Sequence, residues 1–251
     1  MASNIWLLAA ATFVLAGLVK GVIGMGLPTV AMGLLALALP PAEAAALLLL
    51  PSLVTNVWQL LAGPSFASLA RRLWPMMACV ALGTIAGAGV LAGDTAGLAG
   101  AGLASTGLGV VLAAYAAVGL AGVKIAVARR HEAWLGPLVG LTTGLVTGAT
   151  GVFVIPAVPY LQAIGLDKEE LIQALGLSFT VSTVALGLGL LQVQALPPGA
   201  LWMSLLALAP ALGGMLFGQA LRRRITAATF RRVFFVGLLL LGLYLALRGI
   251  A

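Results

Sequence analysis

Charged side chains are scarce in this sequence of 251 residues, and their scarcity excludes an ordinary soluble fold. Only 8% of the residues are Asp, Glu, Lys or Arg and 62% are hydrophobic, whereas a soluble domain usually carries about a quarter charged residues. So few polar groups could not cover a folded chain of this length in water. We therefore predict an all-α polytopic membrane protein, because apolar helices satisfy their own backbone hydrogen bonds in lipid. The apolar stretches are continuous and do not alternate with a period of two, which excludes a transmembrane barrel.

Cysteine and histidine are nearly absent, and this argues against several kinds of chemistry. A single cysteine, Cys79, cannot form an intramolecular disulfide. The single histidine, His131, lies in the charged run Arg-Arg-His-Glu. No metal-ligand cluster and no Ser-His or Cys-His pair occurs within the apolar stretches, as an enzyme site would need. We expect no enzyme activity, no metal and no cofactor.

Acidic residues are fewer than basic ones, so the formal net charge is +7. The basic residues are clustered in short connections, without the interleaved aromatic residues of a groove that binds single-stranded nucleic acid. Nucleic acid is therefore not an expected partner. The rule that cytoplasmic loops of membrane proteins are rich in Lys and Arg explains the clusters better. They are Arg71 and Arg72; Lys124, Arg129 and Arg130; and Arg222, Arg223, Arg224, Arg231 and Arg232.

Charge and the positions of Pro and Gly divide the chain into eight apolar blocks. These are residues 4–39, 42–63, 74–92, 96–127, 133–165, 170–196, 199–221 and 230–250. Several are close to the ~20 residues that span a membrane, but the first and fifth are much longer. The opening MASNIW lacks the basic region of a cleaved signal peptide, so we expect the first block to be retained as a span.

The two long blocks resemble each other, which predicts a duplication. GLVKGVIG at residues 17–24 and GLVTGATG at residues 144–151 differ at three positions. Nearly the same offset pairs Glu43 with Glu170, Thr55 with Ser182, Asn56 with Thr183, Trp74 with Trp202 and Tyr115 with Tyr244. We predict two homologous halves, residues 1–127 and 128–251, each with four apolar blocks, which together form one transmembrane domain.

The basic clusters predict how the two halves are oriented. If every block crossed the membrane once, the basic loop at residues 222–232 would lie outside, against the positive-inside rule. If each long block instead folds back at its glycine-rich centre, all three basic loops lie on the cytoplasmic side. Each half then crosses an odd number of times, and the halves form an inverted repeat of the kind found in secondary transporters. Re-entrant hairpins and pairs of short spans both remain open for the long blocks.

The glycine-rich centres are the first candidate binding elements. They contribute Gly21, Gly24 and Gly26 in the first block, and Gly148 and Gly151 in the fifth. Glycine permits backbone conformations that break a helix. A helix that restarts after a break would direct free N–H groups and a positive dipole end at the membrane centre, which suits an anion. The alternative is that these glycines only allow tight helix packing.

Lys20 is the one cation within an apolar block and away from its ends. A charge in the bilayer core is costly and indicates function. Beside a helix break, its ammonium group could bind a substrate oxyanion. The alternative is that Lys20 extends to a membrane interface. Its counterpart Thr147, with the nearby Thr150, offers hydroxyl groups instead of charge.

Two further polar sets lie in the second and sixth blocks. They comprise Ser52, Thr55, Asn56 and Gln59, and Ser178, Thr180, Ser182 and Thr183. These groups could bind substrate oxygens or join transmembrane helices to one another. Asn56 is the favoured ligand, because an unpaired amide in lipid is especially costly.

Glu43 and Glu170 occupy matching positions near the starts of the second and sixth blocks. Carboxylates stabilise helix N-termini, so a structural role is the first interpretation. Coupling of transport to protons is the alternative, and coupling to sodium is equally open.

The stretch GLVKGVIGMGLP at residues 17–28 resembles the first motif of the TauE/SafE sulfite-exporter family, also called the 4-toluene sulfonate uptake permeases. The run GLTTGLVTGATGVFVIPAVPYLQAIGLDKEEL is similar to that family's repeated motif, and GQALRRRITAATFRRVFFVGLLLLGLYL is similar to its C-terminal pattern. The resemblance implies transport of sulfur oxyanions or organosulfonates across a bacterial inner membrane. It assigns no site residue, so the candidates above depend on physical chemistry alone.

These observations predict a multi-pass secondary transporter of small sulfur-containing anions, such as sulfite, sulfonates or related organosulfur acids. Alternating access of two inverted halves to a midplane site is the expected mechanism. The expected partners are the anion and the lipid bilayer, and a homo-oligomer is left open. A passive channel for a small anion or neutral solute and a non-transporting membrane scaffold are the alternatives.

Overall fold

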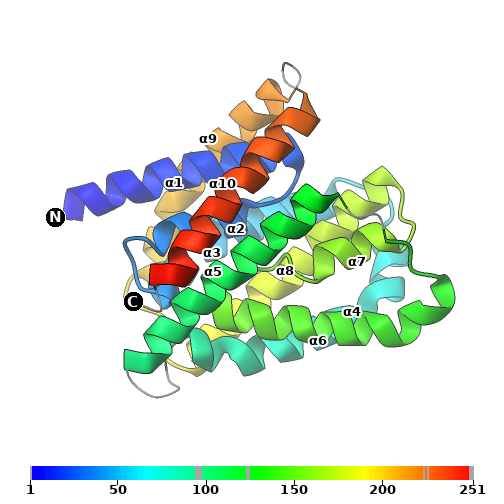
Figure 1. The fold of residues 1–251 in the computed structure, drawn as a ribbon, viewed down its shortest axis with the longest axis horizontal. Helices are drawn as coiled ribbons and strands as arrows, with labels where there is room; N and C mark the ends of the chain where they lie inside the picture. Colours follow the sequence, from blue (N-terminus) through cyan, green and yellow to red (C-terminus); the bar gives the residue numbers. More distant parts are fainter. Residues whose placement is uncertain (1, 94–97, 123–124, 223, 225, 249–251) are drawn as a thin grey trace.

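The computed structural model describes residues 2–93, 98–122, 125–222, 224 and 226–248, and helices are the only regular secondary structure there (Figure 1). Seven of them are apolar and long enough to cross a membrane, so the predicted all-α polytopic fold is confirmed. The helices are α1 (Ala2–Ile23), α2 (Leu27–Leu35), α3 (Pro41–Leu61), α4 (Phe66–Leu91), α5 (Leu98–Ala121), α6 (Glu132–Thr150), α7 (Ala157–Ala163), α8 (Lys168–Gln192), α9 (Ala200–Leu221) and α10 (Ala227–Arg248), with a 3₁₀ turn η1 (Arg129–His131) before α6.

Each of the two long apolar blocks consists of two helices separated by a break. The first break follows α1, and Gly24 and Gly26 adopt φ angles of +87° and +101° there. The second break follows α6 and begins at Gly151, with φ +71°. Residues with a side chain rarely adopt these angles, so glycine ends the helices at these positions. Pro28 in the first turn of α2 and Pro156 just before α7 suit the start of the next helix.

The second of the two long blocks, which contains α6 and α7, turns back on itself, because its two ends meet at one end of the bundle. Arg72 donates two hydrogen bonds to the Glu132 carboxylate, 2.7 and 2.8 Å long, at the start of α6. The same guanidinium donates to the carbonyl of Ile164, just after α7, at 2.8 Å. At the opposite end of the bundle, Arg248 donates to the Leu37 carbonyl at 3.1 Å and so joins the end of α10 to the chain after α2.

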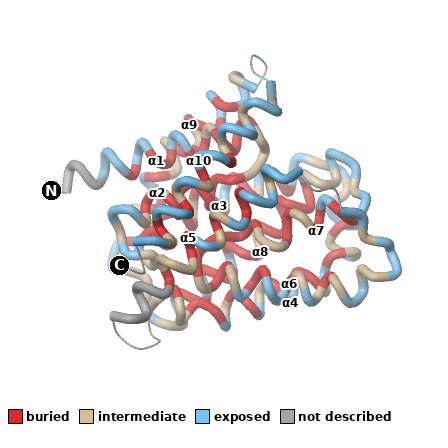
Figure 2. The backbone as a smooth tube through the Cα atoms, in the orientation of Figure 1, coloured by how far each residue is buried: buried red, intermediate tan, exposed pale blue. Residues whose placement is uncertain are grey.

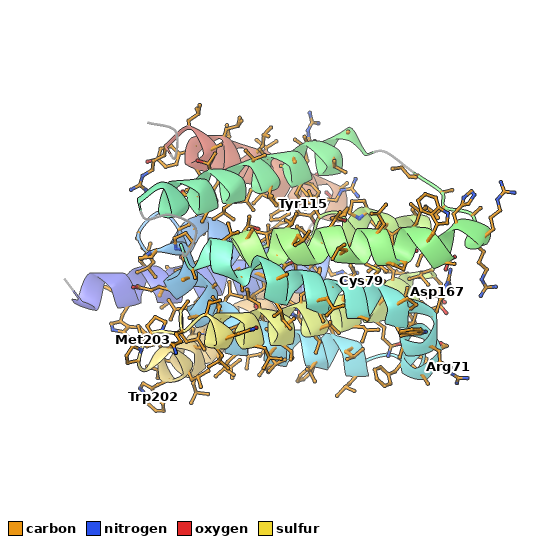
Figure 3. All side chains as sticks on the ribbon, turned by 90° about the horizontal axis from the view of Figure 1, so that it is seen from below. Arg71, Cys79, Tyr115, Asp167, Trp202 and Met203 are labelled. Atoms are coloured by element: carbon orange, nitrogen blue, oxygen red, sulfur yellow. The ribbon has the colours of Figure 1, made fainter. Side chains whose placement is uncertain are left out.

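The two ends of the bundle differ in the side chains that they carry. Arg71 and Asp167 lie at one end of the long helices, and Trp202 and Met203 lie at the other (Figure 3). We call the end with Arg71 and Arg72 the basic end, and the end with Trp202 and Met203 the distal end.

The long helices contact one another in matching pairs. α1 packs against α9 and α4 against α6, while α3 contacts α8 and α5 contacts α10. The α3–α8 and α5–α10 pairs run antiparallel. The contacts that give this direction are Gly176 with Leu60 and Gly187 with Leu49 in the first pair, and Gly109 with Ala246 and Gly119 with Phe235 in the second.

Glycines bring the backbones of α1 and α9, and of α4 and α6, into direct contact. A Cβ atom on Gly21 would overlap the Met215 carbonyl oxygen of α9. A Cβ atom on Gly148 would overlap the Thr84 carbonyl oxygen and lie 2.8 Å from the Gly87 Cα atom. Small residues at helix interfaces allow this close packing in membranes, where lipid is as apolar as the side chains.

Buried residues follow the surfaces between helices, and exposed residues lie mainly on the outer faces (Figure 2). Large apolar side chains such as Leu82, Phe217 and Leu240 are exposed there. An exposed apolar exterior around a buried core is what a protein surrounded by lipid requires.

Candidate functional site

Lys20 lies in the last turn of α1 and is directed into the protein, with only 4% of its surface exposed. Its Nζ atom donates a hydrogen bond to Oδ1 of Asn56 on α3. Among the residues that the structure describes, no carboxylate forms an ion pair with Lys20. A buried ammonium group whose partner is a neutral amide is strongly disfavoured unless another group neutralises it. A negatively charged group beside Lys20 would neutralise it.

Asn56 links Lys20 to α8, in the second half of the chain. Its Nδ2 atom donates to Oγ1 of Thr183 at 3.4 Å, and the Thr183 hydroxyl donates to the Phe179 carbonyl at 2.7 Å. Asn56 is fully buried and Thr183 nearly so. We call Lys20, Asn56 and Thr183 the central cluster. It joins three helices, α1, α3 and α8, from both halves of the chain.

Several buried hydroxyl groups on the surrounding helices have no hydrogen-bond partner within the described residues. Ser52 lies one helical turn before Asn56 on α3, and Ser178 lies one turn before Ser182 on α8. Buried polar side chains are normally hydrogen-bonded, so unpaired hydroxyls need an explanation. Groups that can donate a hydrogen bond suit a bound oxyanion. The full set is Thr29, Ser52, Thr143, Ser178 and Ser182.

The two breaks begin with the same hydrogen bond. The Gly24 amide donates to the Lys20 carbonyl at 2.7 Å, and the Gly151 amide donates to the Thr147 carbonyl at 2.7 Å. Lys20 and Thr147 therefore occupy the same place, one turn before the break. The predicted correspondence between these two residues agrees with this geometry.

The hydroxyl groups of the second break are already used by the backbone. Thr147 Oγ1 donates to the Thr143 carbonyl at 2.7 Å, and Thr150 Oγ1 donates to the Val146 carbonyl at 2.7 Å. The side chain of Met32 from α2 also packs against Gly151, where a Cβ atom would lie 2.8 Å from its Cε atom. At the second break, the two threonine hydroxyls therefore bond to backbone carbonyls, and Met32 of α2 occupies the space beside Gly151.

The predicted site glycines fall into two groups. Gly24, Gly26 and Gly151 form the breaks themselves. Gly21 and Gly148 lie in the α1–α9 and α4–α6 interfaces and contact the backbone of the facing helix. The contacts of these last two are those of the packing alternative.

Gln59 and Thr55 lie on α3 with Asn56 but make other contacts. Gln59 Nε2 donates to the Ile172 carbonyl on α8 at 2.8 Å, and Thr55 Oγ1 donates to the carbonyl of Pro51 in its own helix at 2.7 Å. Gln173 makes the reciprocal contact, because its Nε2 atom donates to the Leu60 carbonyl at 2.7 Å. The sequence analysis missed Gln173, although a second buried amide near the start of α8 was a usable signal. Gln59 and Gln173 join α3 to α8.

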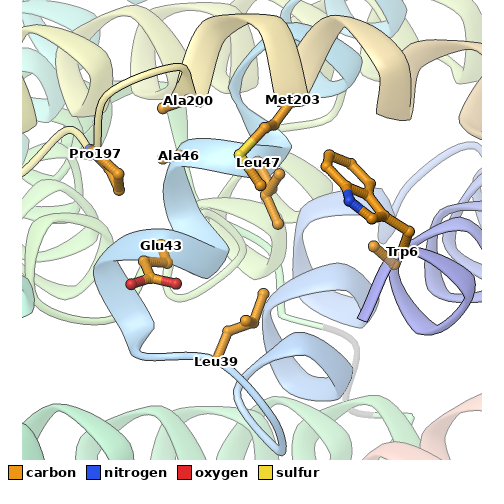
Figure 4. Close-up of a pocket in the computed structure, with 9 residues that line it drawn as sticks. Trp6, Leu39, Glu43, Ala46, Leu47, Pro197, Ala200 and Met203 are labelled. Carbon is orange, nitrogen blue, oxygen red and sulfur yellow. The ribbon is translucent and has the colours of Figure 1, made fainter. Parts of the chain in front are cut away.

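Glu43 and Glu170 lie at helix starts. Glu170 completes a capping box on α8, in which its amide donates to Asp167 Oδ1 at 2.8 Å. Glu43 is in the first turn of α3 and lines a cavity of about 200 Å³ at the distal end, together with Trp6 and Met203 (Figure 4). Neither carboxylate forms an ion pair with Lys20.

One known protein family matches most of the chain. Residues 9–245 match the model of the family described as Sulfite exporter TauE/SafE, so the predicted family resemblance is confirmed. The matched range includes both breaks and the central cluster. No curated protein and no solved structure matches the chain.

Proposed function

We propose that this chain, which belongs to the Sulfite exporter TauE/SafE family, is a secondary transporter of small sulfur-containing anions such as sulfite or sulfonates. The family and the seven apolar helices support a multi-pass membrane transporter. One observation carries the proposed substrate class: a buried lysine, Lys20, with a neutral amide as its partner. An anion bound at Lys20 would supply the missing negative charge.

The groups around Lys20 match the chemistry of a sulfur oxyanion. Sulfite and sulfonates carry three oxygens on sulfur, and each oxygen accepts hydrogen bonds. Lys20 can provide one charged donor, and the unpaired hydroxyls of Ser52, Ser178 and Ser182 can provide neutral ones. A hydrogen bond to a charged group contributes about 1.5–3 kcal/mol, roughly twice a neutral one. The ammonium group is a compact point charge on a flexible stem with three donors, so it can bond to any of these oxygens.

The arrangement of helices supports an inverted repeat of residues 1–127 and 128–251. The matching α1–α9 and α4–α6 contacts, and the antiparallel α3–α8 and α5–α10 pairs, are what two halves of opposite orientation would give. In this proposal, α1–α2 and α6–α7 are re-entrant hairpins whose breaks meet near the midplane. Rocking of one half against the other would expose the central cluster to each side in turn, as in other transporters with inverted repeats.

The basic end is the proposed cytoplasmic side. Arg71, Arg72 and Glu132 lie there, and the guanidinium of Arg72 joins α4 to the ends of the α6–α7 hairpin. Basic loops are retained on the cytoplasmic side of membranes. The inner membrane of a bacterium is the proposed location. The proposal assigns the coupling of transport to no residue.

Reconstituted protein tests the proposed function. We expect saturable sulfite counterflow by the unchanged chain, and its loss in Lys20→Met, which keeps the length of the side chain without its charge. Lys168→Met is the matched control, because Lys168 is exposed at the start of α8. Counterflow that persists in Lys20→Met would refute the role of Lys20. Currents far above carrier turnover would indicate a channel instead.

A further inference from the structure

A cavity of about 600 Å³ lies at the basic end, between α5, α7, α10 and the first break. Gln162 of α7 lines it, two residues before the Ile164 carbonyl that Arg72 binds. Arg231, in the first turns of α10, is the only charged residue of its described lining. The cavity therefore combines mostly apolar walls with one basic group.

The inner wall of this cavity belongs to the turn that follows Lys20. Ile23 and Met25 both line it, and the Gly24 amide between them donates to the Lys20 carbonyl at 2.7 Å. A displacement of this short segment would bring the cavity to the turn of the chain that carries the ammonium group.

Tyr115 of α5 contacts this wall at Met25. Its hydroxyl donates to Met25 Sδ at 3.4 Å, and its ring meets Phe235 of α10 edge-on, with 5.2 Å between the ring centroids. Gly119, one turn after Tyr115, leaves the space that the Phe235 ring occupies, because a Cβ atom there would overlap that ring. Tyr115 is nearly fully buried. An ordered aromatic pair thus supports Met25 from one side.

Met25 lies in the break between α1 and α2. It lies between Gly24 and Gly26, both at positive φ, and glycine adopts several backbone conformations at little cost. The unbranched side chain of methionine is itself adaptable. A change in the position of Met25 is therefore less costly here than it would be within either helix.

We propose that this cavity is the passage by which sulfur anions reach Lys20 from the basic end, and that Met25 and Tyr115 form the barrier between the two. The inference rests on the proposed function. Arg231 would raise the local concentration of anions in the cavity, because a positive charge in a low-dielectric cleft attracts them. The corresponding positions of the second half differ: Tyr244, the counterpart of Tyr115, is 55% exposed, and the side chain of Met32 fills the space beside Gly151.

Cysteine labelling tests the barrier directly. In a Cys79→Ser background, Lys20→Cys reports access to the central cluster by the impermeant anion 2-sulfonatoethyl methanethiosulfonate, added on the side of the basic end. We expect Tyr115→Ala to raise the labelling rate about tenfold, the change that a barrier lower by ~1.4 kcal/mol gives. Tyr244→Ala is the matched control and should leave the rate unchanged.

Met25→Ala removes the other half of the barrier and should accelerate labelling to a similar extent. It also provides an independent answer if Tyr115→Ala does not elute as a folded protein on size exclusion. If Lys20→Cys is labelled at the parent rate in a folded Tyr115→Ala or Met25→Ala variant, Tyr115 and Met25 do not form the barrier.

A pair of adjacent arginines tests the passage. Gln162→Cys places a thiol in the cavity, and Arg231→Gln should slow its labelling by the same anionic reagent several-fold, with a smaller effect at high salt. Arg232→Gln should leave the rate unchanged, because Arg232 is exposed on the same helix but does not line the cavity. Equal effects of the two substitutions would overturn the role of Arg231.

These labelling rates do not depend on sulfite, so they separate the inference from the proposed function. Sulfite binding that survives Lys20→Met, together with labelling controlled by Tyr115, would refute the binding site and keep the passage. Sulfite binding that requires Lys20, together with labelling insensitive to Tyr115 and Met25, would refute the passage and keep the site.

Discussion

At the first break the Gly24 amide is bonded to the Lys20 carbonyl, and at the second the Gly151 amide is bonded to the Thr147 carbonyl, over the same distance of 2.7 Å. The two side chains at this shared position differ. The ammonium of Lys20 crosses to Asn56 on another helix, whereas the hydroxyl of Thr147 bonds within its own helix. The two breaks thus share a backbone geometry, but the first carries a charged side chain that reaches another helix and the second carries a hydroxyl that bonds within its own helix.

The two breaks share their helix packing but differ in the chemistry of the side chain that precedes the packing glycine. Gly21 and Gly148 meet the facing helix backbone in the same way, although the residues just before them, Lys20 and Thr147, differ. Substitutions of the glycines should therefore have equal effects in the two halves, and substitutions of their neighbours should have unequal effects.

The largest difference is expected between Lys20→Met and the matched Thr147→Met. Removing one partner of a buried charged contact costs about 2–5 kcal/mol of binding. Lys20→Met should therefore lose roughly thirtyfold or more in sulfite affinity, at ~1.4 kcal/mol per tenfold. Without sulfite, the same variant should melt at a higher temperature than the unchanged chain, because a buried ammonium without a counter-charge is costly and methionine removes that cost. Calorimetric titration and thermal unfolding measure the two effects. A lower melting temperature together with intact sulfite binding would contradict both.

The next effect should be the same in the two halves. Gly21→Ala and Gly148→Ala each force a Cβ atom against a carbonyl oxygen, and overpacking of this kind typically costs ~1–3 kcal/mol. Both variants should therefore unfold at lower temperature by similar amounts. Gly213→Ala is the control, since a Cβ atom there meets nothing within 4 Å, and alanine favours a helix by up to ~1 kcal/mol over glycine. An unchanged unfolding temperature for only one of the two variants would show that the two breaks are not structurally equivalent.

A smaller effect is expected when the first break receives its own counter-charge. Asn56→Asp would present a carboxylate to the Lys20 ammonium, where the amide oxygen now accepts its hydrogen bond. The carboxylate would compete with an anion, so sulfite affinity should fall about tenfold, which corresponds to ~1.4 kcal/mol. Binding titrations at constant ionic strength measure this change. Unaltered affinity would mean that the anion does not bind beside the Lys20–Asn56 contact.

The smallest effect is expected for Thr147→Val at the second break. Its hydroxyl bonds to the Thr143 carbonyl, and the loss of such a hydrogen bond costs about 0.5–1.5 kcal/mol of stability. Sulfite affinity should not change measurably in the same titration. A loss of affinity comparable to that of Lys20→Met would make the second break an equal part of the site.

Composition and the positions of glycine and proline were enough to predict the main features of the fold. The scarcity of charge predicted apolar spans, and the glycines at 24, 26 and 151 predicted where the long blocks break, because the reasons lie in the local chemistry of each residue. Lys20 and Asn56 were both candidates because each is costly in lipid, and they form one hydrogen-bonded pair.

Other features depend on which helices face each other, which local chemistry does not reveal. Gly21 and Gly24 belong to one motif in the sequence, yet the first packs against α9 and the second ends a helix. Gly213 and Gly214 are adjacent in the sequence, yet a Cβ atom on Gly213 would meet nothing within 4 Å, whereas Gly214 lies against Val14. Only the three-dimensional contacts distinguish these positions.

The surroundings of several other polar side chains were missed for the same reason. Thr29 and Thr143 are buried and unpaired, and Tyr115 contacts Met25, but nothing in their local sequence indicates these surroundings. A buried hydroxyl becomes informative only when its lack of a partner is known.

A cryo-electron microscopy map of the protein with selenite, a heavier oxyanion of the same shape as sulfite, tests the central claim most directly. We expect density within hydrogen-bonding distance of Lys20 Nζ, on the side of α1 that faces Asn56, and none beside Thr147. Selenite density elsewhere, with the Lys20–Asn56 contact unchanged, would contradict the account.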